Sequence, residues 1–110
     1  MNEAEMRLAV YGSLAPGRLN HHQLSNLSGH WRPGKVRGRL EARGWGAAVG
    51  FPGLVLDSRG DEIEVQLFEC QELPAHWMRL DGFEGDGYRR VTARVETASG
   101  AVEACVYVLV

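Results

Sequence analysis

The chain has 110 residues, of which 45% are hydrophobic, which suffices for one domain with one core but not for two. With 24% charged residues and a formal net charge of −2, it lacks the basic face that a nucleic-acid-binding protein usually carries. No apolar run approaches the ~20 residues of a membrane span, and the N-terminus has no apolar signal core. We therefore expect a single domain over residues 1–110 in the cytoplasm, with neither nucleic acid nor membrane as a partner.

Glycine, at 14 of 110 residues, separates short apolar segments, and this pattern predicts strands joined by turns. The predicted strands, in chain order, are residues 7–11, 34–40, 54–56, 62–68, 88–96 and 102–110. The alternating residues predicted on one face are Val36, Gly38 and Leu40 in the second strand, Ile63, Val65 and Leu67 in the fourth, and Val106, Val108 and Val110 in the last. In the fourth strand, Phe68 adds an apolar residue to the opposite face.

Helical spacing occurs in two stretches. Residues 19–27 are a short candidate. Leu73, Trp77 and Leu80 lie at i, i+4 and i+7, which predicts a helix over residues 73–83 that ends near a glycine. Six short strands and two helical stretches favour an α+β domain whose sheet curls into a barrel, with one or two short helices beside it.

The first candidate site is the sequence Y-G-S-L at residues 11–14. A strand that runs into a glycine turn exposes successive backbone N–H groups, which can bind an anion or a developing oxyanion. The spacing from Gly12 to Gly17 matches a phosphate loop, but Lys and Ser/Thr do not follow, so a nucleotide site is not predicted. The residues around Ser13 do not match the G-x-S-x-G pattern of a nucleophile elbow. Taken alone, an ordinary turn remains the alternative.

The second candidate site, residues 80–89 (L-D-G-F-E-G-D-G-Y-R), joins the predicted helix to the next strand. An apolar residue precedes Glu84, and an apolar environment raises the pKa of a carboxyl toward neutrality, as a proton shuttle requires. A solvated loop carboxylate is the alternative. We expect Asp81 and Asp86 to form turns rather than to pair with Glu84. Tyr88 is placed either to bind a ligand or to pack.

Metal ligands and disulfides are not predicted. His21 and His22 are adjacent and point to different sides, and no carboxylate stands at helical spacing from them. No C-x-x-C pair is present. Cys70 and Cys105 both lie in apolar, strand-like surroundings, so we expect buried, reduced thiols, with a disulfide as the alternative.

In order and spacing, these motifs resemble the γ-glutamylcyclotransferase superfamily, especially its γ-glutamylamine cyclotransferase-like branch. The residues that carry the resemblance are Tyr11, Gly12, Ser13, Leu14, Gly17, Asn20, His21, the strand G-K-V-R-G-R-L at 34–40, Phe51, Pro52, Leu80, Asp81, Phe83, Glu84, Gly85, Tyr88 and Arg90. They span nearly the whole chain. Two neighbouring residues depart from the pattern. Val65 stands where the family often has glycine, and we expect it to crowd the local backbone, and Gln66 replaces a frequent glutamate.

The resemblance implies a small mixed β-barrel with a cavity at one end, a small-molecule γ-glutamyl substrate and no cofactor. Glu84 is implied as the general acid/base. The residues implied to bind the substrate are Tyr11, Gly12, Ser13, Leu14 and Tyr88. In the implied reaction, the α-amine of the substrate attacks its own γ-glutamyl carbonyl, which forms 5-oxoproline and releases an amine or an amino acid.

Three other interpretations use the same residues. A binding module would hold a small carboxylate or amine without turnover, although Glu84 argues against it because carboxylate binding favours Arg or Lys. A γ-glutamyl hydrolase or transferase on the same scaffold would form a different product, since attack by water gives glutamate. In a structural or interaction protein, Gly12 and Glu84 would be dispensable.

Overall fold

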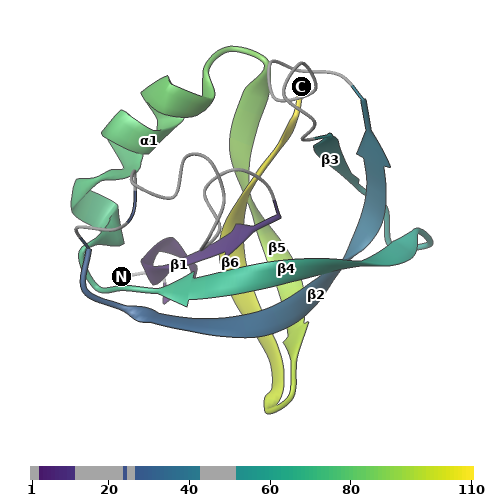
Figure 1. Ribbon diagram of the computed structural model, residues 1–110, viewed down its shortest axis with the longest axis horizontal. Coiled ribbons are helices and arrows are strands. Elements are labelled where there is room, and N and C mark those ends of the chain that lie inside the picture. The colour runs from purple at the N-terminus through teal and green to yellow at the C-terminus, as the bar shows by residue number, and fades with distance from the viewer. Residues whose placement is uncertain (1–2, 12–23, 25–26, 43–51) are drawn as a thin grey trace.

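The computed structural model describes residues 3–11, 24, 27–42 and 52–110. Its elements are η1 (Glu3–Met6), β1 (Arg7–Val10), β2 (His30–Glu41), β3 (Gly53–Leu56), β4 (Asp61–Glu69), η4 (Leu73–Ala75), α1 (Trp77–Glu84), β5 (Tyr88–Thr97) and β6 (Gly100–Leu109). Five strands close a barrel in the order β2-β4-β1-β6-β5, and β3 adds a sixth strand beside β2 (Figure 1). Only the β1–β6 pair is parallel among the described strands. The predicted mixed barrel with a flanking helix is confirmed.

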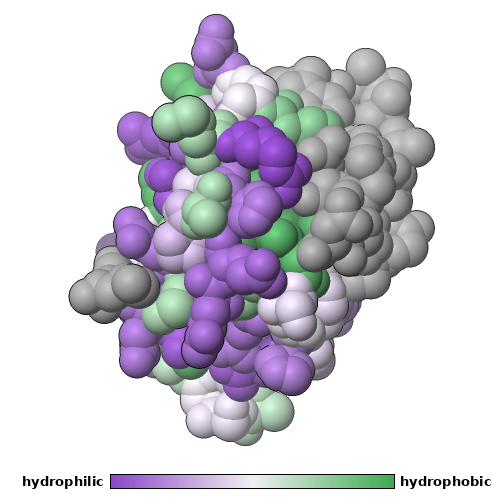
Figure 2. All heavy atoms as spheres, turned by 90° about the vertical axis from the view of Figure 1, so that its left-hand side faces the viewer, coloured by the Kyte–Doolittle hydropathy of each residue, from purple (hydrophilic) through white to green (hydrophobic). Residues whose placement is uncertain are grey.

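The predicted helix over residues 73–83 divides into the 3-10 turn η4 and the helix α1. Its buried residues face the barrel, whereas Met78 on the outer side is 89% exposed. Figure 2 shows the side of the molecule that carries α1, where hydrophilic residues predominate and hydrophobic ones are scattered. None of the described helices is both long and apolar enough to cross a membrane. Of the predicted helix over residues 19–27, only Leu24 and Leu27 lie within the described residues.

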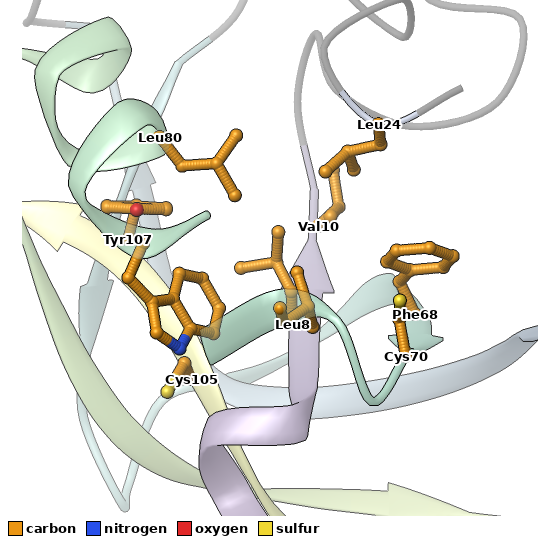
Figure 3. Close-up of a cluster of buried hydrophobic side chains, with 10 residues drawn as sticks. Leu8, Val10, Leu24, Phe68, Cys70, Leu80, Cys105 and Tyr107 are labelled. Carbon is orange, nitrogen blue, oxygen red and sulfur yellow. The ribbon is translucent and has the colours of Figure 1, made fainter. Parts of the chain in front are cut away.

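Side chains are buried on both faces of the barrel wall. Alternate residues of β1 and β6 separate accordingly: Ala9 and Val106 belong to the interior cluster, whereas Leu8 and Cys105 belong to a second cluster under α1 (Figure 3). Phe68 belongs to the second cluster as well, on the face opposite the interior residues of β4, as predicted. The two layers explain why neighbouring residues of one strand are both apolar.

The alternating residues predicted on one face are not buried at the ends of two strands. Leu40 is 43% exposed and Val110 is 68% exposed. The pairing of β2 with β4 stops at Gly38, and β6 ends at Leu109. Because both residues lie past the closed part of the barrel, their alternation continues without a core to cover them.

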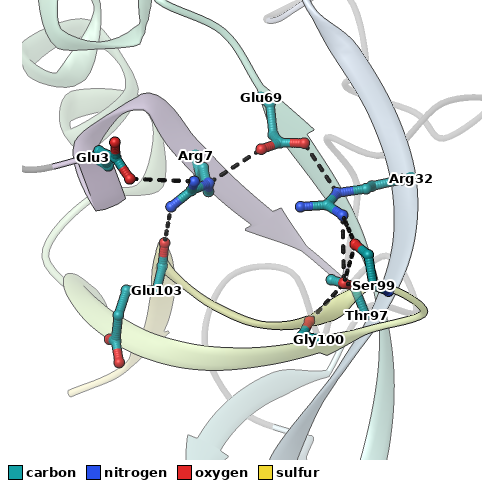
Figure 4. Close-up of polar contacts among 8 residues, drawn as sticks. All are labelled: Glu3, Arg7, Arg32, Glu69, Thr97, Ser99, Gly100 and Glu103. Atoms are coloured by element: carbon teal, nitrogen blue, oxygen red, sulfur yellow. Dashed lines mark hydrogen bonds and ion pairs between the residues drawn. The ribbon is translucent and has the colours of Figure 1, made fainter.

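A network of polar side chains joins several strands (Figure 4). The Glu69 carboxylate forms ion pairs with Arg7 (3.1 Å) and Arg32 (2.9 Å). Arg32 also donates to Ser99 Oγ at 2.8 Å, and Arg7 donates to the carbonyl of Glu103 at 3.1 Å. These contacts join β4 to β1, β2 and the β5–β6 hairpin, so the network is structural. Across the described ranges, no three His, Cys, Asp or Glu side chains are grouped to hold a metal ion.

Val65, the predicted point of crowding, faces a glycine across the sheet. It pairs with Gly34 of β2, and a Cβ added at Gly34 would lie 3.6 Å from Val65 Cγ2 and 2.6 Å from Val95 Cγ1. The glycine on β2 therefore makes room for Val95 of β5, whereas its distance to Val65 is that of an ordinary van der Waals contact. This site lies beside the Lys35–Glu96 pair that closes the barrel.

The two cysteines are free and buried, as predicted. Cys70 packs in the cluster under α1, and Cys105 packs in the same cluster from β6. Burial is the main reason that the pKa of the Cys105 thiol is raised. Both side chains therefore act as small apolar residues of the core.

Candidate active site

Glu84 is the last residue of α1 rather than a loop residue. Trp77 and Leu80 are buried in the cluster under the helix, and Glu84 follows them at i+7 and i+4, so it lies on the same side of α1. The Glu84 side chain is half-buried, and burial raises the pKa of its carboxyl to about 7. The predicted loop position is wrong, because Glu84 belongs to the helix.

The helix ends at Glu84 because the next residue is a glycine in a backbone conformation that other residues avoid. Gly85 has φ 81° and ψ −174°, a region essentially restricted to glycine. Its N–H donates to the carbonyl of Asp81 at 3.0 Å, which closes the last turn of α1. The local sequence therefore ends the helix directly after the candidate acid/base.

Tyr11 follows β1 directly and is held by two hydrogen bonds. Its hydroxyl donates to the carbonyl of Tyr107 at 2.7 Å and accepts from the N–H of Leu54 at 3.1 Å. Burial raises the pKa of the Tyr11 phenol above its usual range, the Leu54 hydrogen bond lowers it by less, and the charges of Glu84 and Tyr88 raise it further. The three predicted site residues Tyr11, Glu84 and Tyr88 therefore lie close enough to interact. The other predicted substrate-binding residues, Gly12, Ser13 and Leu14, lie outside the described residues.

Tyr107 and Arg90 also belong to the described part of this site, and neither was predicted as a site residue. The Tyr107 hydroxyl donates to Asp81 Oδ1 at 2.6 Å. Arg90 Nε donates to the same oxygen at 3.0 Å, and its Nη2 donates to Asp81 Oδ2 at 3.3 Å. The turn-forming role predicted for Asp81 is wrong, because Asp81 lies inside α1 and binds these two residues. Two features of the sequence point to these residues: a tyrosine interrupts the valines of the last predicted strand, and an arginine directly follows the second candidate site.

The titrating groups of this site differ in which protonation states they populate near neutral pH. Burial, followed by the hydrogen bond and the charge of Asp81, raises the pKa of Tyr107 above its usual range, as burial does for Tyr11. Both phenols therefore stay protonated. Glu84, with a pKa of about 7, populates both forms. Among these three residues, Glu84 is the one that can exchange a proton at neutral pH.

Comparison with known proteins places the chain in a family. The family described as "Gamma-glutamyl cyclotransferase, AIG2-like" matches residues 8–110. A solved structure of YkqA from Bacillus subtilis is 30% identical with a TM-score of 0.73, and the match covers 94% of this chain but 35% of YkqA. An AIG2-like protein from Mus musculus is 24% identical with a TM-score of 0.72, covering 94% of this chain and 76% of that protein.

A structure named gamma-glutamyl cyclotransferase is 17% identical with a TM-score of 0.65, and the match covers 96% of this chain and 66% of the other. At these identities, the mouse protein and this structure support the fold alone. No curated protein sequence matches the chain. The family match itself includes Tyr11, Glu84 and Tyr88. The chain therefore belongs to the AIG2-like gamma-glutamyl cyclotransferase family.

Proposed function

We propose that the protein is an active γ-glutamyl cyclotransferase of the γ-glutamylamine type, with Glu84 as its general acid/base. The observation that carries the proposal is the buried carboxyl of Glu84, whose pKa is about 7, close to the charged and phenolic groups of the two family motifs. A general acid/base works best when its pKa lies near the working pH. Family membership supplies the substrate class, a γ-glutamyl small molecule.

The proposed reaction needs one group that first takes a proton and then gives it back. The carboxylate of Glu84 removes a proton from the α-ammonium group of the substrate, and the free amine attacks the γ-carbonyl carbon. A C–N bond forms, which closes a five-membered ring, and the carbonyl becomes a tetrahedral oxyanion. The protonated Glu84 then donates to the leaving nitrogen as the old C–N bond breaks, and the ring nitrogen releases its second ammonium-derived proton to the solvent. The products are 5-oxoproline and a free amine, and no cofactor is consumed.

The remaining motif residues have supporting roles in this proposal. The backbone N–H groups of Gly12, Ser13 and Leu14 stabilise the oxyanion, as glycine turns do in other acyl-transfer enzymes. Tyr88 contacts the γ-glutamyl chain. The pocket folds this chain into the attacking shape, and correct orientation can supply roughly 7–11 kcal/mol of the barrier. Tyr11 contributes a fixed phenol, because both of its hydrogen bonds are made within the protein.

A product-resolved screen tests the proposal. The protein is incubated with γ-glutamyl-amines and γ-glutamyl-amino acids, and 5-oxoproline, glutamate and released amine are quantified separately. We expect 5-oxoproline and amine in equal amounts. Glutamate in place of 5-oxoproline would identify a hydrolase. Binding without any product would identify a binding module, and either result would reject the proposed function.

A further inference from the structure

Tyr107 forms hydrogen bonds to two parts of the candidate site, one through its backbone carbonyl and one through its hydroxyl. Its backbone carbonyl accepts the hydroxyl of Tyr11 at 2.7 Å, and its own hydroxyl donates to Asp81 at 2.6 Å. Figure 3 shows the ring of Tyr107 beneath α1, beside Leu80, with its oxygen toward the helix. One residue of β6 thus holds both the phenol that follows β1 and the last turn of α1.

The acceptor on the helix is itself held in place. Arg90 of β5 forms a two-point contact with Asp81, at 3.0 and 3.3 Å, which fixes the plane of the carboxylate. The guanidinium of Arg90 lies over the ring of Trp77, with its Cζ 4.4 Å from the ring centroid, in a cation–π contact. The Trp77 indole donates to the carbonyl of Glu5 at 3.0 Å. Tyr107 therefore binds an oxygen of α1 that is held by β5 through Arg90, while Trp77 ties the same helix to η1.

The position of this contact on α1 matters for the proposed acid/base. The helix has eight residues, too few to be stable without tertiary contacts. Asp81 and Glu84 are three residues apart and share the last turn, which ends at Gly85. The end of a helix unravels most easily, so a hydrogen bond at Asp81 limits the movement of Glu84.

We infer that Tyr107 is a positioning residue, which fixes the carboxyl of Glu84 relative to the phenol of Tyr11. Tyr107 contacts neither of the nitrogens between which Glu84 moves a proton. It acts through Asp81 and through its own backbone carbonyl. This inference rests on the proposed function for its effect on turnover, but its effect on the surroundings of Glu84 is independent of turnover.

The substitution Tyr107→Phe tests the inference, because it removes the hydroxyl and keeps the ring, the backbone carbonyl and the Asp81–Arg90 ion pair. We expect kcat for 5-oxoproline release to fall by about 10- to 100-fold, as a displaced catalytic group does, with KM changed by less than about threefold. Ser99→Ala is the matched control: it removes a hydroxyl that accepts from Arg32 at 2.8 Å, away from α1, and should leave kcat unchanged.

The double variant Glu84→Gln/Tyr107→Phe separates positioning from general structural support. If Tyr107 acts through Glu84, the double variant is as slow as Glu84→Gln alone, because residues that act as a unit are not additive. A further loss of kcat in the double variant, or an unchanged kcat in Tyr107→Phe, would overturn the inference and leave the proposed function standing.

A second readout needs no turnover. Titration of the Glu84 carboxyl by ¹³C NMR reports its surroundings. Tyr11 and Tyr107 are electrostatically coupled to Glu84. Asp81, which Arg90 binds, lies on the same helix. We expect Tyr107→Phe to lower the pKa of Glu84 from about 7 toward that of a solvated carboxyl, because a released helix end admits water. If the wild type forms no 5-oxoproline, the proposed function is rejected. Independently of that result, an unchanged pKa of Glu84 in Tyr107→Phe would overturn the inference.

Discussion

The burial of Glu84 links its affinity for a proton to the stability of the fold. In an unfolded chain, the pKa of a glutamate is about 4.3, whereas the pKa of Glu84 in the folded protein is about 7. The folded state therefore holds the proton more tightly, so the free energy of unfolding falls as the pH rises through this window. Above this window, the ionised carboxylate lowers the free energy of unfolding by at most about 4 kcal/mol.

Glu84→Gln is expected to remove this cost, because the amide stays uncharged. At pH 8 the variant should be more stable than the wild type by about 1–3 kcal/mol, and near pH 4.5 the gain should disappear. Urea denaturation at both pH values measures this difference. Glu64→Gln, on the exposed side of β4, is the control and should show no gain at pH 8. An equal stability difference for Glu84→Gln at both pH values would mean that the carboxyl is solvated.

The sequence was more informative about the residues of the motifs than about the groups that hold them. Tyr11, Glu84 and Tyr88 belong to two separate motifs, and in the folded protein the charges of Glu84 and Tyr88 reach the Tyr11 phenol. Tyr107 was not identified because its partner Asp81 lies on a different element, far away in the sequence. Alternation assigns a face to Tyr107 but cannot specify a hydrogen bond across two elements.

At the scale of elements, the critical residue is the glycine directly after α1, because it sets the end of the helix. Gly85→Ala places a Cβ at φ 81° and ψ −174°, which costs about 1–3 kcal/mol, although no heavy atom lies within 4 Å of that Cβ. We expect the variant to be destabilised by this amount in thermal or urea unfolding, and kcat to fall because the last turn carries Glu84.

Gly82→Ala is the matched control for this prediction. Gly82 lies within the same helix, and its added Cβ also meets nothing within 4 Å. Alanine in a helix interior is favoured over glycine by roughly 0.5–1 kcal/mol, so this variant should be slightly more stable than the wild type. Equal stability of the two alanine variants would show that the conformation of Gly85 is not strained for other residues.

The limits of α1 illustrate which parts of an element a sequence pattern can define. The spacing of Leu73, Trp77 and Leu80 correctly indicated a helical segment, and its first turn proved to be the 3-10 turn η4. A pattern of buried residues does not separate these two forms in so short a segment. The apolar spacing ends before Glu84 and therefore predicts a loop there, whereas the backbone conformation of Gly85 sets the actual end of the helix.

At the scale of the whole molecule, the closure of the barrel depends on a small residue at Gly34. The alternation of apolar residues predicted the strands and the barrel correctly. It did not predict where β2 meets β5, because the Lys35–Glu96 pair joins distant parts of the chain, and such pairing depends on the packing between faces.

Gly34→Ala tests this account of closure. The new methyl group would lie 2.6 Å from Val95 Cγ1, and overpacking of a core costs about 1–3 kcal/mol. We expect the urea midpoint to fall accordingly. Val95→Ala should also destabilise, by leaving a cavity, and the double variant should lose less than the sum of the two by roughly 0.5–3 kcal/mol, as residues in contact do. Strict additivity would mean that the two positions do not touch.

The most direct test of the central claim is the rate of 5-oxoproline release by the wild type and by Glu84→Gln, measured on the best substrate of the product screen at neutral pH. We predict that the variant keeps its fold and that its kcat falls by at least about 100-fold, as is typical when a general acid/base is removed. A folded Glu84→Gln protein that releases 5-oxoproline at the wild-type rate would contradict the account.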